Sequence, residues 1–209
     1  MWNHGRVTTV LLLGVIVCGL SAGRSDAAEP IDIGSRLELF VDEFLIDRMK
    51  DLELELHRPT FQNIAVKLDK PWEGNIGCYI TVFKDGDKFR MYYRGANWDP
   101  KTKKAGPQRV CYAESTDGKT WTKPQLGIIE VAGSKANNLI WEGDGSHNFT
   151  PFKDPNPDCK PDEKYKAVAT VKGGLGAFKS KDGIHWSRLT DKPIITKGAF
   201  DSQNLAFYD

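Results

Sequence analysis

The stretch C-Y-I-T-V-F-K-D-G-D-K-F-R-M-Y-Y-R-G at 78–95, followed after a polar loop by Q-R-V-C-Y-A-E-S-T-D-G-K-T-W at 108–121, decides the fold. It contains three runs rich in β-branched and aromatic residues, separated by turn signals, which is the pattern of a small antiparallel sheet. Asp85-Gly86 separates the first two runs, where a tight hairpin favours residues that tolerate positive φ. Alternation along the second run places Arg90 on a face that we interpret as solvated.

The end of this stretch is repeated later in the chain. E-S-T-D-G-K-T-W at 114–121 is matched by K-S-K-D-G-I-H-W at 179–186, and a further unit begins with A-F-D-S-Q-N-L-A-F at 199–207. Repeated small antiparallel sheets are typical of a β-propeller. The sequence therefore predicts an all-β, partial propeller of two four-stranded blades plus the start of a third, with Trp121 and Trp186 in equivalent packed positions. Because two blades cannot close a ring, we expect the chain to be truncated or to depend on a further C-terminal part.

Composition excludes some classes of protein. The chain has 209 residues, 40% hydrophobic and 27% charged, with a formal net charge of +1. These values do not indicate disorder, and the near-neutral charge gives no basic footprint for a nucleic-acid partner.

The N-terminus is typical of a signal peptide. An apolar run occupies 10–20, and small residues at 25–27 favour cleavage before Ala28. The prediction is a signal peptide at 1–27 and a mature chain at 28–209 that is secreted or periplasmic and has no membrane association after cleavage. An uncleaved membrane anchor is the alternative, although the apolar run is shorter than the ~20 residues that span a bilayer.

The mature chain would retain an odd number of cysteines, Cys78, Cys111 and Cys159. One disulfide plus a free thiol, or three free thiols, both fit an exported protein. Their spacing matches no metal site, and neither a metal nor a cofactor is predicted.

The segment before the first sheet contains two candidate strands, L-E-L-F-V-D at 37–42 and L-E-L-E-L-H at 52–57, with a one-turn helix between them. Asp42 is interpreted as a turn residue rather than a cleft carboxylate. Next, Trp72 and Glu73 are either a stacking indole and a carboxylate of a sugar site, or a packed edge tryptophan beside a solvated glutamate. Arg94 ends the second run and could reach a substrate hydroxyl or orient a carboxylate.

Three motifs carry a resemblance to a known family: L-F-V-D-E-F-L-I at 39–46, H-N-F-T-P-F-K-D-P-N-P at 147–157 and F-D-S-Q-N-L-A-F at 200–207. With the S-x-D-G-x-x-W endings, they resemble secreted five-bladed propellers related to glycoside hydrolase families 32 and 43. The chain lacks the W-x-N-D-P-N-G and E-C motifs of those enzymes. K-D-P at 153–155 resembles their R-D-P, which implies that Asp154 is a transition-state-stabilising carboxylate.

The resemblance implies a secreted glycoside hydrolase-like protein with a carbohydrate substrate and carboxylate acid/base chemistry in a propeller funnel. Asp154 and Asp201 occupy corresponding places near the openings of successive units, so we expect them to approach each other, with Glu73 as a third acid. The expected sugar-binding side chains around them are Trp72, Arg94, His147, Asn148, Gln203 and Asn204. A non-catalytic sugar-binding or scaffold propeller is the alternative.

Overall fold

The computed structural model describes residues 29–208 in two compact units, the first ending at Thr60 and the second beginning at Phe61. The predicted signal peptide and its cleavage site lie outside the described residues. Within residues 29–208, no helix is both long enough and apolar enough to cross a membrane.

The first unit, described from residue 29 to 60, contains turns but neither strand nor helix. The strands predicted at 37–42 and 52–57 and the short helix between them are therefore wrong. The side chains of Leu37 and Leu56 are 101% and 92% exposed, so the apolar faces of both predicted strands are uncovered. Apolar alternation alone is not enough, because a strand is stable only when neighbouring strands pair with it. Asp42 is a turn residue as predicted: its Oδ1 accepts a hydrogen bond from the Phe44 N–H at 3.0 Å.

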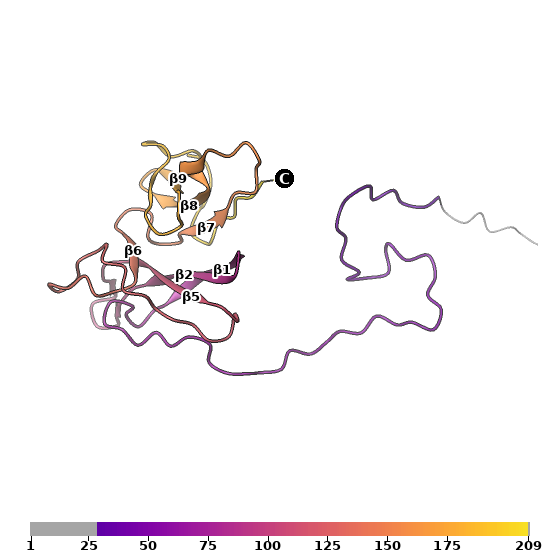
Figure 1. Cartoon of the computed structure of the whole chain (residues 1–209), viewed down its shortest axis with the longest axis horizontal. Helices are drawn as coiled ribbons and strands as arrows, with labels where there is room; N and C mark the ends of the chain where they lie inside the picture. The colour runs from indigo at the N-terminus through magenta and orange to yellow at the C-terminus, as the bar shows by residue number, and fades with distance from the viewer. Residues whose placement is uncertain (1–28, 209) are drawn as a thin grey trace, which may run out of the picture. The chain divides into compact units, whose positions relative to one another are not determined.

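The second unit is all-β, as predicted, and its main elements are two four-stranded antiparallel sheets (Figure 1). The first sheet has the order β1-β2-β5-β6 and consists of β1 (Cys78–Asp85), β2 (Lys88–Gly95), β5 (Arg109–Ser115) and β6 (Leu139–Glu142). The second has the order β10-β9-β8-β7 and consists of β7 (Thr150–Lys153), β8 (Tyr165–Val171), β9 (Gly174–Ser180) and β10 (Ser187–Arg188). In both sheets the first strand in the sequence is an edge strand, and these two strands, β1 and β7, contact each other.

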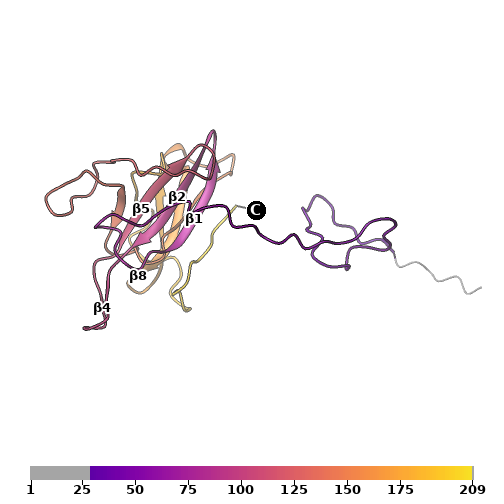
Figure 2. The ribbon, with the colours of Figure 1, turned by 90° about the horizontal axis from the view of Figure 1, so that it is seen from below.

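Two small elements complete the unit. A hairpin of β3 (Trp98–Asp99) and β4 (Lys104–Ala105) projects between β2 and β5 (Figure 2), and a 3-10 turn, η1, covers Pro161–Glu163 before β8. The third predicted unit forms no strand within 199–208. The two four-stranded sheets are thus confirmed as antiparallel sheets, while a closed ring of blades remains a prediction.

The repeated S-x-D-G-x-x-W loops have the same local structure. In the first loop the Ser115 hydroxyl accepts from the Gly118 N–H at 2.9 Å, and Asp117 Oδ1 accepts from the N–H groups of Lys119 and Thr120. Ser180 and Asp182 make the same bonds in the second loop. These local side-chain bonds replace strand pairing and end each third strand at the same point.

The tryptophans that follow the two loops pack against different clusters. Trp186 lies edge-on to Tyr92 and Phe149 in the core between the two sheets, whereas Trp121 packs on the opposite face of the first sheet against Met91 and Tyr93. Each therefore helps to cover the first sheet, but from opposite sides.

The second loop also joins the two sheets. Tyr92 Oη donates to the Gly183 carbonyl at 2.9 Å, and Arg90 Nη1 donates to the Asp182 carbonyl at 2.8 Å. A Cβ on Gly183 would lie 2.8 Å from Arg90 Nη1 and 2.9 Å from Tyr92 Oη, so the close approach requires glycine. The interpretation of Arg90 as solvated is wrong, because its face is covered by the second sheet and its side chain is buried.

Candidate functional site

The predicted site residues that come together do so where β1 begins and β2 ends. Arg94 lies opposite Cys78 in the β1–β2 register, and its guanidinium lies over the Tyr79 ring at 4.8 Å. Arg94 Nη1 is 2.9 Å from Nδ1 of His147, which immediately precedes the β7 region, and the Tyr79 and His147 rings meet edge-on at 5.3 Å. Arg94 at the end of β2 and His147 in the segment before β7 therefore meet where the two sheets are in contact.

His147 is bonded through both ring nitrogens. Nε2 lies 3.4 Å from Asp201 Oδ1, and Nδ1 lies 2.9 Å from Gln108 Oε1 in addition to Arg94. Arginine can only donate, so a neutral His147 that accepts from Arg94 carries its proton on Nε2, toward Asp201. In this tautomer Nδ1 carries no proton and accepts from Arg94.

Asp201 is held by its backbone while its carboxylate is free to meet solvent. Its carbonyl accepts hydrogen bonds from Tyr79 Oη at 3.2 Å and from Asn148 Nδ2 at 3.3 Å. Its side chain is 94% exposed. The carboxylate of Asp201 is therefore both positioned and accessible.

Asn148 organises this end of the second sheet from a fully buried position. Its Oδ1 accepts from the Thr170 N–H at 2.8 Å, and its Nδ2 donates to the carbonyls of Phe200 and Ser202, each at 2.6 Å. The expectation that Asn148 contacts sugar hydroxyls is corrected by this burial. It instead fixes the 200–202 segment, and with it Asp201.

Gln203 and Asn204 lie at the same end of the unit. Gln203 Nε2 donates to Thr81 Oγ1 at 3.1 Å, and Asn204 Nδ2 donates to the Ser202 carbonyl at 2.9 Å. Both side chains are half-buried. They tie the C-terminal segment to β1 and to itself.

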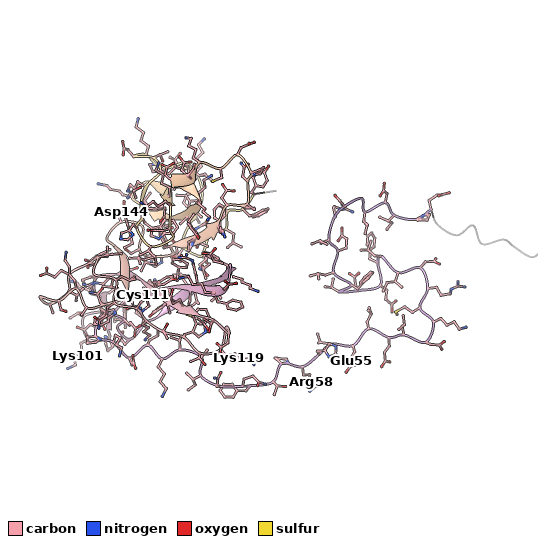
Figure 3. The ribbon with its side chains drawn as sticks, in the orientation of Figure 1. Glu55, Arg58, Lys101, Cys111, Lys119 and Asp144 are labelled. Atoms are coloured by element: carbon pink, nitrogen blue, oxygen red, sulfur yellow. The ribbon has the colours of Figure 1, made fainter. Side chains whose placement is uncertain are left out.

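A hollow of about 320 Å³ opens beside His147. It is lined by residues from both sheets and the loops next to them: Pro107, Gln108, Glu142, Gly143, Asp144, Gly145, His147 and Thr170. Glu142 is paired with Arg109 Nη2 at 2.9 Å, and Asp144 is paired with Arg188 Nη2 at 2.6 Å. Figure 3 shows Asp144 at the side where the two sheets meet. The hollow is thus lined by hydrogen-bond donors and acceptors, and both carboxylates at its rim are paired with arginines.

Trp72 and Glu73 lie elsewhere, on the face of the first sheet covered by Trp121. Trp72 Nε1 donates to Asn138 Oδ1 at 2.7 Å, and Glu73 is fully buried at 0% exposure. Tyr93 Oη donates to Glu73 Oε1 at 2.5 Å, and Lys123 Nζ pairs with the same oxygen at 2.7 Å. Trp72 is the packed edge tryptophan of the two interpretations, and Glu73 is a buried structural carboxylate rather than a solvated one.

Asp154 is also separated from the His147 group. Asp154 follows β7 and lies opposite Lys164, whose carbonyl accepts its N–H at 3.0 Å, whereas Asn148 lies opposite Thr170. Six residues of extended chain between Lys164 and Thr170 span about 20 Å, so the structure does not bring Asp154 together with Asp201. Burial alone would raise the pKa of Asp154, but the 2.5 Å bond from Lys166 and a backbone N–H outweigh it and lower the pKa. Asp154 is thus an ion-paired turn residue in this structure.

Five residues at this place are not among the predicted site residues: Tyr79, which contacts the His147 ring, and Gln108, Glu142, Asp144 and Thr170, which line the hollow. Gln108 ends a polar loop that contributes nothing to the core, so it gives no sequence signal of its own. Glu142 and Asp144 flank Gly143, and acidic residues beside a glycine are typical of a turn between strands rather than of a binding site. Their convergence depends on the pairing of β1 with β2 and on the contact between the sheets, which local patterns do not specify.

The three cysteines 78, 111 and 159 are free thiols, which settles the alternatives that the sequence left open. Burial raises the pKa of the Cys111 thiol, which favours its protonated form. Within residues 29–208 no group of three or more His, Cys, Asp or Glu side chains could hold a metal ion.

Comparison of the chain with protein-family models, with curated proteins and with solved structures finds no match. The site is therefore interpreted from its own geometry.

Proposed function

We propose that the chain is an exported, carbohydrate-binding β-propeller protein that holds sugar in the hollow beside His147. The observation that carries this proposal is the convergence of Gln108, His147 and Thr170 on one open hollow whose rim also bears two carboxylates. Sugar hydroxyls both donate and accept hydrogen bonds, and a mixed set of donors and acceptors fits that chemistry.

The ion pairs at the rim support binding more directly than they support hydrolysis. Glu142 and Asp144 are each paired with an arginine, at 2.9 and 2.6 Å, and their remaining lone pairs can accept from sugar hydroxyls. Glycoside cleavage needs two carboxyl groups that flank the scissile bond, one of them giving a proton to the leaving oxygen. Both rim carboxylates are instead engaged by an arginine of the protein.

Glycoside hydrolysis is the second candidate, and the geometry of Asp201 favours it. Its exposed carboxylate lies 3.4 Å from His147 Nε2, so the imidazole could take or return a proton beside a bound sugar. In this version Asp201 takes a proton from the attacking water, and His147 gives a proton to the leaving oxygen.

The test is a titration of the purified protein with neutral and acidic oligosaccharides by isothermal titration calorimetry. His147→Ala and Gln108→Ala should each weaken binding about tenfold, because each removes hydrogen bonds to a ligand in a partly desolvated site. Lys197→Ala, on an exposed loop of the same unit, is the matched control. Unchanged affinity in both hollow variants would exclude this site.

Hydrolysis is tested separately with aryl glycosides. Asp201→Asn should abolish turnover while leaving sugar affinity and melting temperature close to those of the wild type, if the carboxylate acts in the chemistry. Binding without any turnover by the wild type would leave the protein a lectin-like binder.

A further inference from the structure

The hairpin that precedes the hollow carries an exposed aromatic side chain and a group of cations. Trp98 is 41% exposed, and Lys101, Lys103 and Lys104 follow it within the same hairpin. The strand pairing is short, Trp98 with Ala105 and Asp99 with Lys104, so Lys101 and Lys103 lie at the tip and Lys104 in the strand next to it. Figure 2 shows β4 on a loop that projects away from the sheets, and Figure 3 places Lys101 at the outer edge of the unit.

The base of the hairpin is fixed, although its tip projects. The side chain of Asn75 brackets Trp98, with Oδ1 accepting from the Trp98 N–H at 2.7 Å and Nδ2 donating to the Trp98 carbonyl at 3.0 Å. The Gly106 N–H closes the base by donating to the Asn97 carbonyl at 2.8 Å. The indole is therefore presented on an anchored strand rather than on a free loop.

The three lysines of the hairpin are not neutralised by acidic residues of the hairpin itself. Asp99 is its single acid, and its carboxylate accepts from the Lys101 N–H at 2.9 Å and from Thr102 Oγ1 at 2.9 Å. Bonds from the Lys101 backbone and the Thr102 hydroxyl lower the Asp99 pKa. Among residues 29–208, no ion pair involves Lys101, Lys103 or Lys104.

The hairpin leads directly into the proposed sugar site. Pro107 and Gln108 follow it and line the hollow beside His147. Two residues separate Ala105 from Gln108, and the three Cα–Cα steps between them reach about 10 Å. A polymer lying on the hairpin could therefore continue to the hollow.

We propose that the 97–106 hairpin binds an acidic polysaccharide, with the Trp98 indole packed on a sugar ring and the lysines on carboxylate or sulfate groups. This inference rests on the proposed carbohydrate function and narrows it to anionic polymers. Aromatic faces offer a flat apolar surface for the CH groups of a sugar, and ammonium groups bind anions as mobile point charges.

Other anionic partners fit this surface less well. Binding to an anionic membrane usually needs a cluster of 4–8 basic residues, more than this hairpin carries. A nucleic-acid footprint needs a broad basic face, which the net charge of +1 does not provide. A single aromatic face with a short line of cations suits a narrow charged chain.

The experiment measures affinity for chondroitin sulfate and for polygalacturonate at 50 to 500 mM NaCl, with dextran as the neutral polymer. The variants are Trp98→Ala and the triple variant Lys101→Gln/Lys103→Gln/Lys104→Gln. The matched control is Lys119→Gln/Lys135→Gln/Lys181→Gln, which makes the same charge change at exposed positions away from the hairpin. Vesicles of phosphatidylglycerol and phosphatidylcholine are the membrane probe.

We expect the hairpin triple variant to bind the acidic polymers about tenfold more weakly at 50 mM NaCl, from three exposed ion pairs of ~0.5 kcal/mol each. Its log–log salt slope should fall by about 2, at ~0.7 per cation on a flexible polyanion. Trp98→Ala should weaken binding about tenfold with an unchanged salt slope, by analogy with base stacking on aromatics. The control should stay within about twofold of the wild type.

Equal affinities of the hairpin and control triple variants for both acidic polymers would overturn the inference. So would binding to the vesicles but not to either polysaccharide. If His147→Ala abolishes oligosaccharide binding while the hairpin triple variant retains polymer affinity, the proposed function stands and the hairpin inference fails. If the hairpin variants alone weaken polymer binding, the hairpin inference stands and the hollow is not the sugar site.

Discussion

Asp85 is the residue whose replacement most directly tests how the two sheets are held together. Its Oδ2 accepts from Arg90 Nε at 2.5 Å and from Tyr165 Oη at 2.6 Å, and its Oδ1 pairs with Lys153 Nζ at 2.6 Å. Arg90 belongs to the first sheet, whereas Lys153 and Tyr165 belong to the second. Asp85→Asn keeps the shape of the side chain and removes its charge from this junction.

The expected loss of unfolding free energy depends on how deeply Asp85 and its partners are buried. The side chains of Asp85 and Arg90 are 8% and 9% exposed, and removing one partner of such a pair costs about 3–5 kcal/mol. The Lys153 side chain is 37% exposed and can turn to solvent, so its share is small. We therefore expect Asp85→Asn to lower the free energy of unfolding by about 3 kcal/mol. For a unit of this size the melting temperature should fall by roughly 6–12 °C.

The assay is urea unfolding at pH 7, followed by tryptophan fluorescence and repeated at lower pH. Burial alone would raise the Asp85 pKa, but hydrogen bonds from Lys153, Tyr165 and Arg90 outweigh it and hold the pKa well below the usual range. A depressed pKa stabilises the fold above the pKa of the unfolded state, about 3.9, and this contribution is lost as the pH falls further. The difference between wild type and Asp85→Asn should therefore shrink below about pH 4.

The matched control is Asp87→Asn, an exposed aspartate in the same turn, which should change stability by less than 0.5 kcal/mol. The reasoning is refuted if Asp85→Asn also falls within that range at pH 7. It is equally refuted if the stability difference between the wild type and Asp85→Asn grows on acidification.

Two further substitutions separate structural from functional roles. Glu73→Gln should lower the free energy of unfolding by about 3 kcal/mol, because Lys123 loses its buried partner, while sugar affinity per folded molecule stays unchanged in calorimetry. If Glu73→Gln is as stable as the wild type but binds no sugar, Glu73 has a role in the sugar site and the structural assignment is wrong. Asn148→Ala should weaken sugar binding and increase amide hydrogen exchange in 200–204, because the carbonyls of Phe200 and Ser202 each lose one donor, the buried side chain that fixes this segment. Exchange rates equal to those of the wild type would contradict this positioning role.

The parts of the fold that the sequence predicts are those set by local chemistry. The Asp85-Gly86 turn, the two S-x-D-G-x-x-W loops and the strands next to them depend on residues close in the chain, and these are present. The strands predicted at 37–42 and 52–57 fail because strand formation depends on a pairing partner as well as on alternation.

The candidate site was predicted in part. Arg94, His147 and Asp201 were expected at a substrate site, and the structure brings them together. Asp154 and Glu73 were expected with them, and both are instead held by lysines elsewhere in the unit. A carboxylate in a turn or beside a tryptophan has the same local sequence pattern whether it is structural or catalytic. The lysine that pairs with it, and so shows the structural role, is not next to it in the sequence.

Asp85 and His147 lie at opposite ends of the contact between β1 and β7, so the residue that stabilises the junction of the sheets is distant from the proposed sugar site. Asp85 ends β1 and meets Lys153 at the end of β7, whereas Tyr79 near the start of β1 meets His147, which precedes β7. Cys78 and Asp85 are the two ends of an eight-residue strand, and the seven steps between them span about 23 Å. Substitutions that far apart, with no shared partner, are usually additive. Asp85→Asn should therefore weaken the junction of the sheets without changing sugar affinity per folded molecule, and combining it with His147→Ala should give the sum of the two single effects. An affinity change in Asp85→Asn alone would show that the hollow depends on the junction at the far end of the strands.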